Sequence, residues 1–295
     1  MRVALALGSG GARGYAHIGA IEEIRARGHE IVAIAGSSMG ALVGGLAAAD
    51  RLEPYAEWAR SLTQRDLLRL LDPKWSAPGA IAAGRFFAEV ERLLGEQQIE
   101  ALPIPFTAVA TDLHARREVW FQRGPLVSAI RASTAIPGVI TPVEMNGRLL
   151  ADGGLMNPVP IEPTAVSVAE LTIAISLQGA RTAHERATPA REPAAPTWRE
   201  ELVERVRRTV GRSAEPEPEP EPPTLLEQVR LSDVVGLSMD AMQGLITRYR
   251  MAGLPPDVLV TVPVGAARSL EFHRAAEMIE LGRTLTAEAL DAAGR

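Results

Sequence analysis

Nineteen consecutive uncharged residues, 31–49, read IVAIAGSSMGALVGGLAAA. The first part of this run is rich in β-branched residues and the last part is rich in Ala and Leu, which is typical of a buried strand that leads into a buried helix. Its length would also allow a membrane-spanning helix, but glycines and serines interrupt it repeatedly. We therefore predict a strand, a sharp turn at residues 36–40 and a helix.

Similar short apolar runs recur along the chain, separated by segments with helical patterning. They lie at residues 3–7, 105–111, 171–177 and 258–262. Such alternation predicts an α/β fold of three αβα layers, with a mostly parallel central sheet and helices on both faces. We also expect helices over residues 14–27 and 270–293, and a hairpin turn at Asn146-Gly147.

The composition changes at about residue 180, where Thr, Ala, Arg and Pro become frequent, and residues 215–223 read EPEPEPEPP. Such a run can neither pair as a strand nor continue as a helix. We expect one domain over residues 1–295, with 180–224 as a mobile insertion. Within it, residues 198–210 predict a short amphipathic helix, for which a membrane-surface anchor and a solvated helix or lid are both open interpretations.

The chain contains no cysteine and carries a formal net charge of −5. Disulfides, a thiol nucleophile and a cysteine zinc site are therefore excluded, and a nucleic-acid partner is disfavoured. No cluster of His, Asp and Glu has the spacing of a metal site, so we expect neither a metal nor a cofactor. The apolar start of the chain is too short for a signal peptide, which favours a cytoplasmic protein.

The turn in the opening stretch has the pattern G-x-S-x-G, with Ser38 flanked by Gly36 and Gly40. A serine at a strand-to-helix junction is held on a sharp turn, where its hydroxyl can attack a substrate. The following helix adds free N–H groups and the positive end of a dipole, which stabilise a developing oxyanion. A serine that only caps the helix is the alternative.

A second glycine-rich loop, residues 8–14, reads GSGGARG between the first predicted strand and the first predicted helix. Successive small residues can direct several backbone N–H groups at one point, where a phosphate or an oxyanion would bind. A dinucleotide loop needs G-x-G-x-x-G, but neither frame fits, because one has Ser9 and the other has Arg13 at a glycine position. The phosphate loop of nucleotide hydrolases also lacks its Lys-Ser/Thr ending.

The third segment, Asp152-Gly153-Gly154, follows the predicted hairpin. On its own it is most simply a turn. A serine nucleophile needs a base, yet none of the five histidines lies in a glycine or turn context after Asp152. His17, directly behind the first glycine loop, is more simply a packing or capping residue. The residues alone therefore leave the base of a Ser38 nucleophile unassigned, and Asp152 is of interest for that reason.

Together these segments resemble the patatin-like phospholipases, in particular their small bacterial members. The resemblance rests on Gly10-Gly11-Ala12-Arg13-Gly14, Gly36-Ser37-Ser38-Met39-Gly40 and Asp152-Gly153-Gly154, and it continues through residues 130–138, which read IRASTAIPG, and 157–160, which read NPVP. It covers most of the chain outside residues 180–224. The order and the context of the three motifs make the resemblance specific.

The resemblance implies a Ser–Asp dyad in which Ser38 attacks an ester carbonyl and Asp152 takes its proton. The N–H groups of Gly10, Gly11 and Met39 are then the oxyanion donors. Members of the family often have a third glycine where this chain has Ser9, which lies outside the Gly10-Gly11 pair. Arg13 has two open roles, steadying the loop or meeting a phosphate.

The implied substrate is a lipid ester, a phospholipid or a lysophospholipid, with transient contact at a membrane surface. A carboxylesterase or acyltransferase acting on small esters shares Ser38 and stays an alternative. A scaffold that only keeps the fold is a second alternative, although it would need none of these residues. The sequence leaves the oligomeric state open.

Overall fold

The computed structural model describes residues 1–70, 79–81, 83–180 and 231–295. Two compact units make up the chain: Met1–Arg181 with Met239–Arg295, and Thr182–Ser238. Most of the predicted insertion, including the predicted helix at 198–210, lies outside the described residues, so the single domain with an insertion stays a prediction. Within the described part of the chain, no helix is long and apolar enough to cross a membrane.

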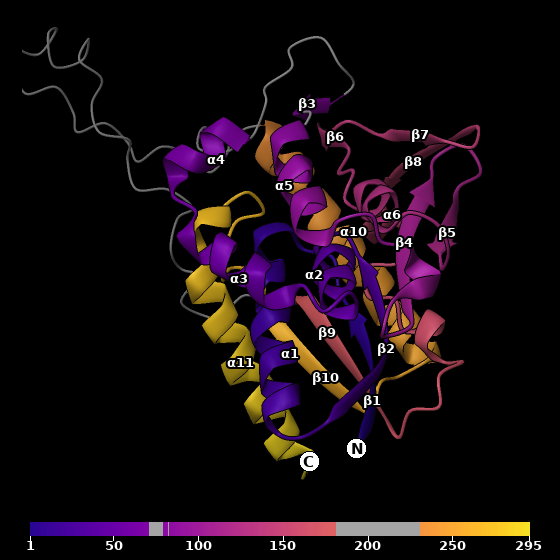
Figure 1. Cartoon of the computed structure of the whole chain (residues 1–295), viewed down its shortest axis with the longest axis vertical. Helices are drawn as coiled ribbons and strands as arrows, with labels where there is room; N and C mark the ends of the chain where they lie inside the picture. The colour runs from indigo at the N-terminus through magenta and orange to yellow at the C-terminus, as the bar shows by residue number, and fades with distance from the viewer. Residues whose placement is uncertain (71–78, 82, 181–230) are drawn as a thin grey trace, which may run out of the picture. The chain divides into compact units, whose positions relative to one another are not determined.

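The first unit is built on an eight-stranded sheet of mixed direction (Figure 1). Its strands are β1 (Arg2–Leu7), β2 (Glu30–Ser37), β4 (Phe106–Asp112), β5 (Arg117–Phe121), β7 (Val143–Met145), β8 (Arg148–Asp152), β9 (Leu171–Gly179) and β10 (Val258–Pro263). The strand order is β10-β9-β1-β2-β4-β8-β7, and β5 pairs with β4 outside this path. β10, β9, β1, β2 and β4 are parallel neighbours, whereas β5, β8 and β7 pair antiparallel. The predicted mostly parallel sheet is confirmed.

Helices and short 3-10 turns connect the strands. The helices are α1 (Ala16–Ala26), α2 (Met39–Ala48), α3 (Leu52–Ser61), α4 (Gln64–Leu70), α5 (Gly84–Leu94), α6 (Leu126–Ser133), α10 (Leu231–Gly253) and α11 (Ala275–Ala292). The 3-10 turns are η1 (Gly11–Tyr15), η2 (Ile99–Ala101), η3 (Gly153–Leu155), η4 (Glu162–Thr164) and η5 (Phe272–Arg274). A separate two-stranded sheet pairs β3 (Gly79–Ile81) with β6 (Gly138–Ile140).

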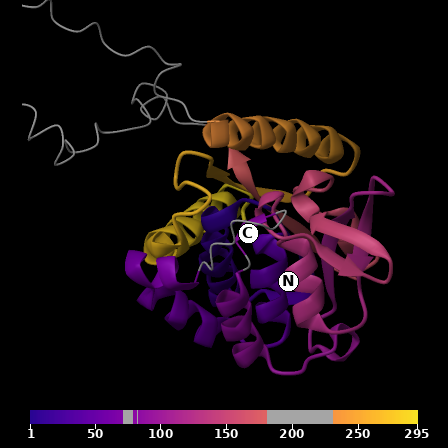
Figure 2. The same ribbon diagram turned by 90° about the horizontal axis from the view of Figure 1, so that it is seen from above.

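The alternation of side chains in β1 explains the layers. Val3, Leu5 and Leu7 belong to the large core cluster that includes α1, α2 and α11, whereas Ala6 belongs to a small cluster with which Met251 of α10 packs. Successive residues of a strand point to opposite faces, so each face acquires its own helical layer. Figure 2 shows the part of α10 from Met239 onward along one face of the sheet and α1, α2 and α11 on the other. The αβα prediction is therefore confirmed.

Two predicted helix boundaries were wrong. The first helix begins at Ala16 instead of residue 14, because residues 11–15 form the 3-10 turn η1, with the Ala12 N–H bonded to the Ser269 carbonyl. The last helix begins at Ala275, after η5. The predicted hairpin turn is confirmed: Asn146 and Gly147 both have positive φ, 51° and 70°, between β7 and β8.

Candidate active site

Ser38 lies on a strained turn between β2 and α2. Its φ of 55° and ψ of −124° are values that residues with a side chain rarely adopt, and such strain costs about 1–3 kcal/mol. The flanking glycines make the turn possible, because a Cβ on Gly36 would collide with the backbone of Gly40, and one on Gly40 with that of Leu7. The turn places Ser38 directly after the last residue of β2 and directly before the first residue of α2.

Ser133, the last residue of α6, holds this turn in place. Its hydroxyl oxygen accepts a hydrogen bond from the Ser38 N–H at 2.9 Å and donates one to the Val109 carbonyl at 2.5 Å. Both side chains are buried. Ser133 therefore ties the nucleophile candidate to the central strand β4 without taking up the Ser38 hydroxyl.

The register of β4 explains why Ser38 meets Asp152. β2 and β8 pair with the same edge of β4 in succession: Ser37 lies opposite Val109, and Asp152 lies opposite Ala110. Because β2 runs parallel and β8 antiparallel to β4, their carboxyl ends point toward each other. The Ser38 hydroxyl then donates a hydrogen bond of 2.5 Å to the Oδ2 atom of Asp152.

The Asp152 carboxylate is buried and has two hydrogen-bond donors. Its Oδ1 atom accepts from the Gly154 N–H at 2.7 Å, and its Oδ2 atom accepts from Ser38. Burial raises the pKa of Asp152 from 3.8 to about 6, although these two hydrogen bonds lower it. The backbone is also fixed, since Thr111 donates to the Asp152 carbonyl at 2.9 Å. A carboxylate with such a pKa can take up and release a proton near neutral pH.

The glycine loop lies against the same site. Gly14 lies close to Met39, the residue after Ser38. Gly154 lies so close to Ser9 that a Cβ on Gly154 would collide with the Ser9 side chain. Gly153 likewise lies against the Val109 carbonyl. In the described part of the chain, no hydrogen-bond acceptor pairs with the N–H groups of Gly10, Gly11 or Met39. Free N–H groups of this kind can bind an oxyanion.

The side chains of His17 and Arg13 both donate hydrogen bonds to backbone carbonyls of this loop. The buried His17 ring donates through Nε2 to the Gly8 carbonyl at 2.7 Å, and burial lowers its pKa to about 4 against the opposing effect of this bond. His17 is therefore a neutral packing residue. Arg13, only 2% exposed, donates to the Gly10 and Val264 carbonyls and to Asp240. Its guanidinium steadies the loop instead of facing a phosphate.

Among the described residues, the Ser38 hydroxyl is hydrogen-bonded to Asp152 and to no histidine. His273 lies 3.4 Å from the Gln64 side chain, through its Nε2 atom, and His184 lies outside the described residues. In the described ranges, no three His, Cys, Asp or Glu side chains could jointly hold a metal ion.

Several residues around the site were missed by sequence reasoning. Ser133 and Thr111 hold Ser38 and Asp152, and Asn157 accepts the hydrogen bond of Ser37 at 2.6 Å through its carbonyl. Ser133 and Asn157 do lie in the segments IRASTAIPG and NPVP, which carried part of the family resemblance. Their place in these two segments was the sequence signal by which Ser133 and Asn157 could have been found.

A serine on a strained turn between a parallel strand and a helix is the nucleophile arrangement of α/β serine hydrolases. Comparisons with known proteins narrow this class. The Patatin-like phospholipase family matches residues 5–165. An NTE family protein of Mycobacterium tuberculosis is 48% identical over 99% of this chain and 92% of its own length.

Two further relatives are more distant. Human patatin-like phospholipase domain-containing protein 6 is 32% identical over 59% of this chain and 13% of its own length. Neuropathy target esterase sws of Drosophila sechellia is 33% identical over 54% of this chain and 11% of its own length. This chain belongs to the patatin-like phospholipase family, and it is a lipid acyl hydrolase.

Proposed function

We propose that the chain hydrolyses carboxylic ester bonds of phospholipids or lysophospholipids through a Ser38–Asp152 dyad and an acyl-enzyme. The observation that carries the proposal is the 2.5 Å hydrogen bond from the Ser38 hydroxyl to the buried Asp152 carboxylate. Membership of the patatin-like phospholipase family supports the lipid class of the substrate.

In the first half of the reaction, the Ser38 oxygen bonds to the ester carbonyl carbon while its proton passes to Asp152 Oδ2. The carbonyl oxygen becomes an oxyanion, and the N–H groups of Gly10, Gly11 and Met39 stabilise it. When the intermediate collapses, the bond to the leaving alcohol breaks and Asp152 returns the proton to that alcohol. The acyl group then remains on Ser38.

In the second half, Asp152 takes a proton from a water molecule, whose oxygen attacks the acyl carbon. The bond to Ser38 breaks, the Ser38 oxygen regains the proton, and the fatty acid leaves. The pKa of about 6 supports this role, because the carboxylate is ionised at neutral pH and still basic enough to accept a proton.

The test compares wild type, Ser38→Ala and Asp152→Asn on chromogenic esters of increasing acyl length and on micelles of lysophospholipid and phospholipid. We expect wild type to cleave the lipids and both variants to lose activity by at least about 10³-fold. Activity on short soluble esters alone would instead favour the small-ester enzyme. A folded wild type that cleaves no ester would favour the scaffold.

A further inference from the structure

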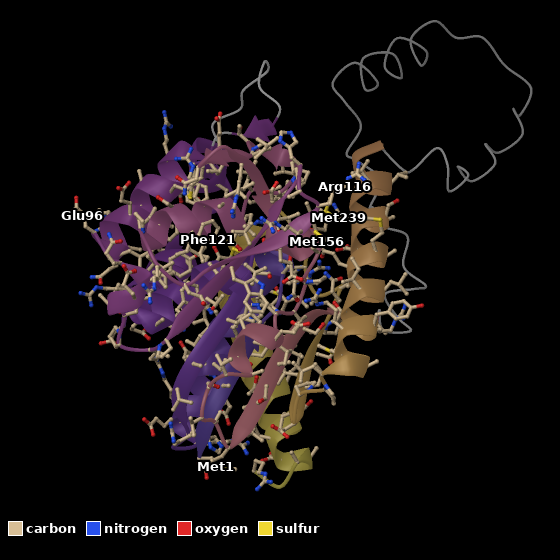
Figure 3. All side chains as sticks on the ribbon, turned by 90° about the vertical axis from the view of Figure 1, so that its right-hand side faces the viewer. Met1, Glu96, Arg116, Phe121, Met156 and Met239 are labelled. Atoms are coloured by element: carbon tan, nitrogen blue, oxygen red, sulfur yellow. The ribbon has the colours of Figure 1, made fainter. Side chains whose placement is uncertain are left out.

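Helix α10 contacts both loops that build the candidate site, through the part of the helix from Met239 onward. Asp240 accepts a hydrogen bond of 3.2 Å from Arg13 of the glycine loop. Ten residues later, Arg250 donates to the Met156 carbonyl at 3.3 Å, in the loop that follows Asp152, and Figure 3 shows Met156 on the side of the sheet next to α10. The two anchors are roughly 15 Å apart along a rigid helix.

The first anchor acts on the oxyanion donors through a single peptide group. Arg13 donates from Nε to the Gly10 carbonyl at 3.2 Å and from Nη1 to the Val264 carbonyl at 2.9 Å. The Gly10 carbonyl and the Gly11 N–H belong to one planar peptide and point in opposite directions. Holding the carbonyl therefore fixes the direction of the Gly11 N–H. Asp240, with its side chain 30% exposed, in turn holds the guanidinium of the buried Arg13 side chain.

The second anchor reaches the residue next to the nucleophile. Arg250 lies 2.7 Å from a carboxylate oxygen of Glu118 and 2.9 Å from one of Glu162. The buried Asn157 amide donates to the other oxygens of these two carboxylates, at 2.9 and 3.1 Å. The Asn157 carbonyl accepts from Ser37 at 2.6 Å. Arg250 thus places one positive charge between two carboxylates that would otherwise repel each other, and it holds the loop from Asp152 to Glu162.

We propose that α10 is the positioning element of the active site, with Asp240 orienting the Gly11 N–H through Arg13, and Arg250 orienting the Asp152 loop through Glu118 and Glu162. The inference rests on the proposed function, because it assigns these residues a role in the same ester hydrolysis. Neither residue touches the reacting atoms. Their effect is on the alignment of groups that stabilise the transition state, where a displacement of about 1 Å can cost 10²-fold in rate.

The experiment uses the full chain with Asp240→Asn, Asp240→Glu, Arg250→Gln and, as the control, Arg248→Gln on the exposed side of α10. kcat and KM are measured on p-nitrophenyl butyrate, together with the rate of inactivation by a fluorophosphonate and the unfolding temperature. We expect Asp240→Asn and Arg250→Gln to lower kcat by about 10- to 100-fold with KM within about twofold, and to slow inactivation in parallel. Asp240→Glu should recover most of the loss, and Arg248→Gln should match wild type.

Wild-type kcat in a folded Asp240→Asn or Arg250→Gln would overturn the proposal, as would a loss that only follows the unfolded fraction. Should Arg250→Gln fail to fold, Glu162→Gln removes one of the same ion pairs and is held to the same criterion. Ser38→Ala separates the two proposals. If it stays active, the proposed function fails; if it is inactive while the α10 variants match wild type, only the positioning role fails.

Discussion

The hydroxyl oxygen of Ser133 lies 2.9 Å from the backbone nitrogen of Ser38, although 95 positions separate the two residues in the sequence. The same hydroxyl donates to the Val109 carbonyl on β4. A strained turn persists only where its surroundings over-determine it, and this bridge is one of the contacts that do so. The nucleophile candidate is therefore held by a residue from α6 as well as by its own glycines.

Ser133→Ala removes this bridge and leaves a buried N–H and a buried carbonyl without that partner. We expect a loss of about 1–3 kcal/mol in the free energy of unfolding and about a tenfold lower kcat. Urea unfolding and ester hydrolysis measure the two effects. Ser128→Ala, on the same helix and half-buried, is the matched control; equal behaviour of the two variants would contradict the role of Ser133.

The strain at Ser38 predicts an unusual order of stability. In most positions glycine is less stable than alanine by roughly 0.5–1 kcal/mol, because it has more freedom in the unfolded chain. At φ 55° and ψ −124° the order should reverse, so that Ser38→Gly is more stable than Ser38→Ala, while both are inactive. Thermal unfolding of the two variants decides this. A lower melting temperature for Ser38→Gly would argue against a strained turn.

The proposed dyad predicts that Asp152 sets the acid limb of activity. The base must be ionised, so kcat/KM should fall about tenfold per pH unit below an apparent pKa near 6 and level off above it. A pH profile on a neutral soluble ester measures this limb. Any residual activity of Asp152→Asn should show no acid limb. If the acid limb persists in that variant, another group is responsible for it.

The raised pKa of Asp152 also predicts a pH-dependent stability. The folded state binds this proton more tightly than the unfolded state, so the contribution of Asp152 to stability is fully present below about pH 4 and is lost as the pH rises to about 6. Asp152→Asn removes this loss. The free energy of unfolding of the variant minus that of wild type should therefore be larger above pH 6 than at pH 4, by up to about 3 kcal/mol. Urea unfolding at pH 4 and pH 8 measures it. If the two proteins differ by the same free energy of unfolding at both pH values, the ionised Asp152 carboxylate does not destabilise the fold.

His17 predicts the opposite dependence. Its pKa is lowered to about 4, so the unfolded state binds the proton more tightly, and stability falls as the pH drops below 6.5 toward 4. His17→Gln keeps a donor for the Gly8 carbonyl and should remove this contribution. The acid limb of kcat/KM should stay near 6 in this variant; its disappearance would make His17 the base.

The layers and the turn at Ser38 could be predicted because they depend on local patterns. Residues 31–49 place a strand, a turn and a helix in direct succession, and Asn146-Gly147 specifies its own hairpin. The meeting of Ser38 with Asp152 could not be derived this way. It depends on two strands that share one edge of β4, which local periodicity does not encode, so the pairing rested on the family resemblance.

The supporting contacts were beyond the sequence for a similar reason. Asp240 and Arg13 are 227 positions apart, and neither has neighbours that signal an ion pair. Asp240 becomes a candidate only once α10 is known to cross the glycine loop. Arg13 could be assigned either a loop-supporting or a phosphate-binding role until its burial and its three acceptors were seen.

The Ser38–Asp152 pair is tested most directly by covalent trapping. Wild type and Asp152→Asn are treated with a fluorophosphonate, and the modified peptide and the rate of modification are measured by mass spectrometry. We predict a single adduct on Ser38 that forms at least about 10²-fold more slowly in Asp152→Asn, because the hydroxyl has lost its base. An adduct on another residue, or equal rates in the two proteins, would contradict the dyad.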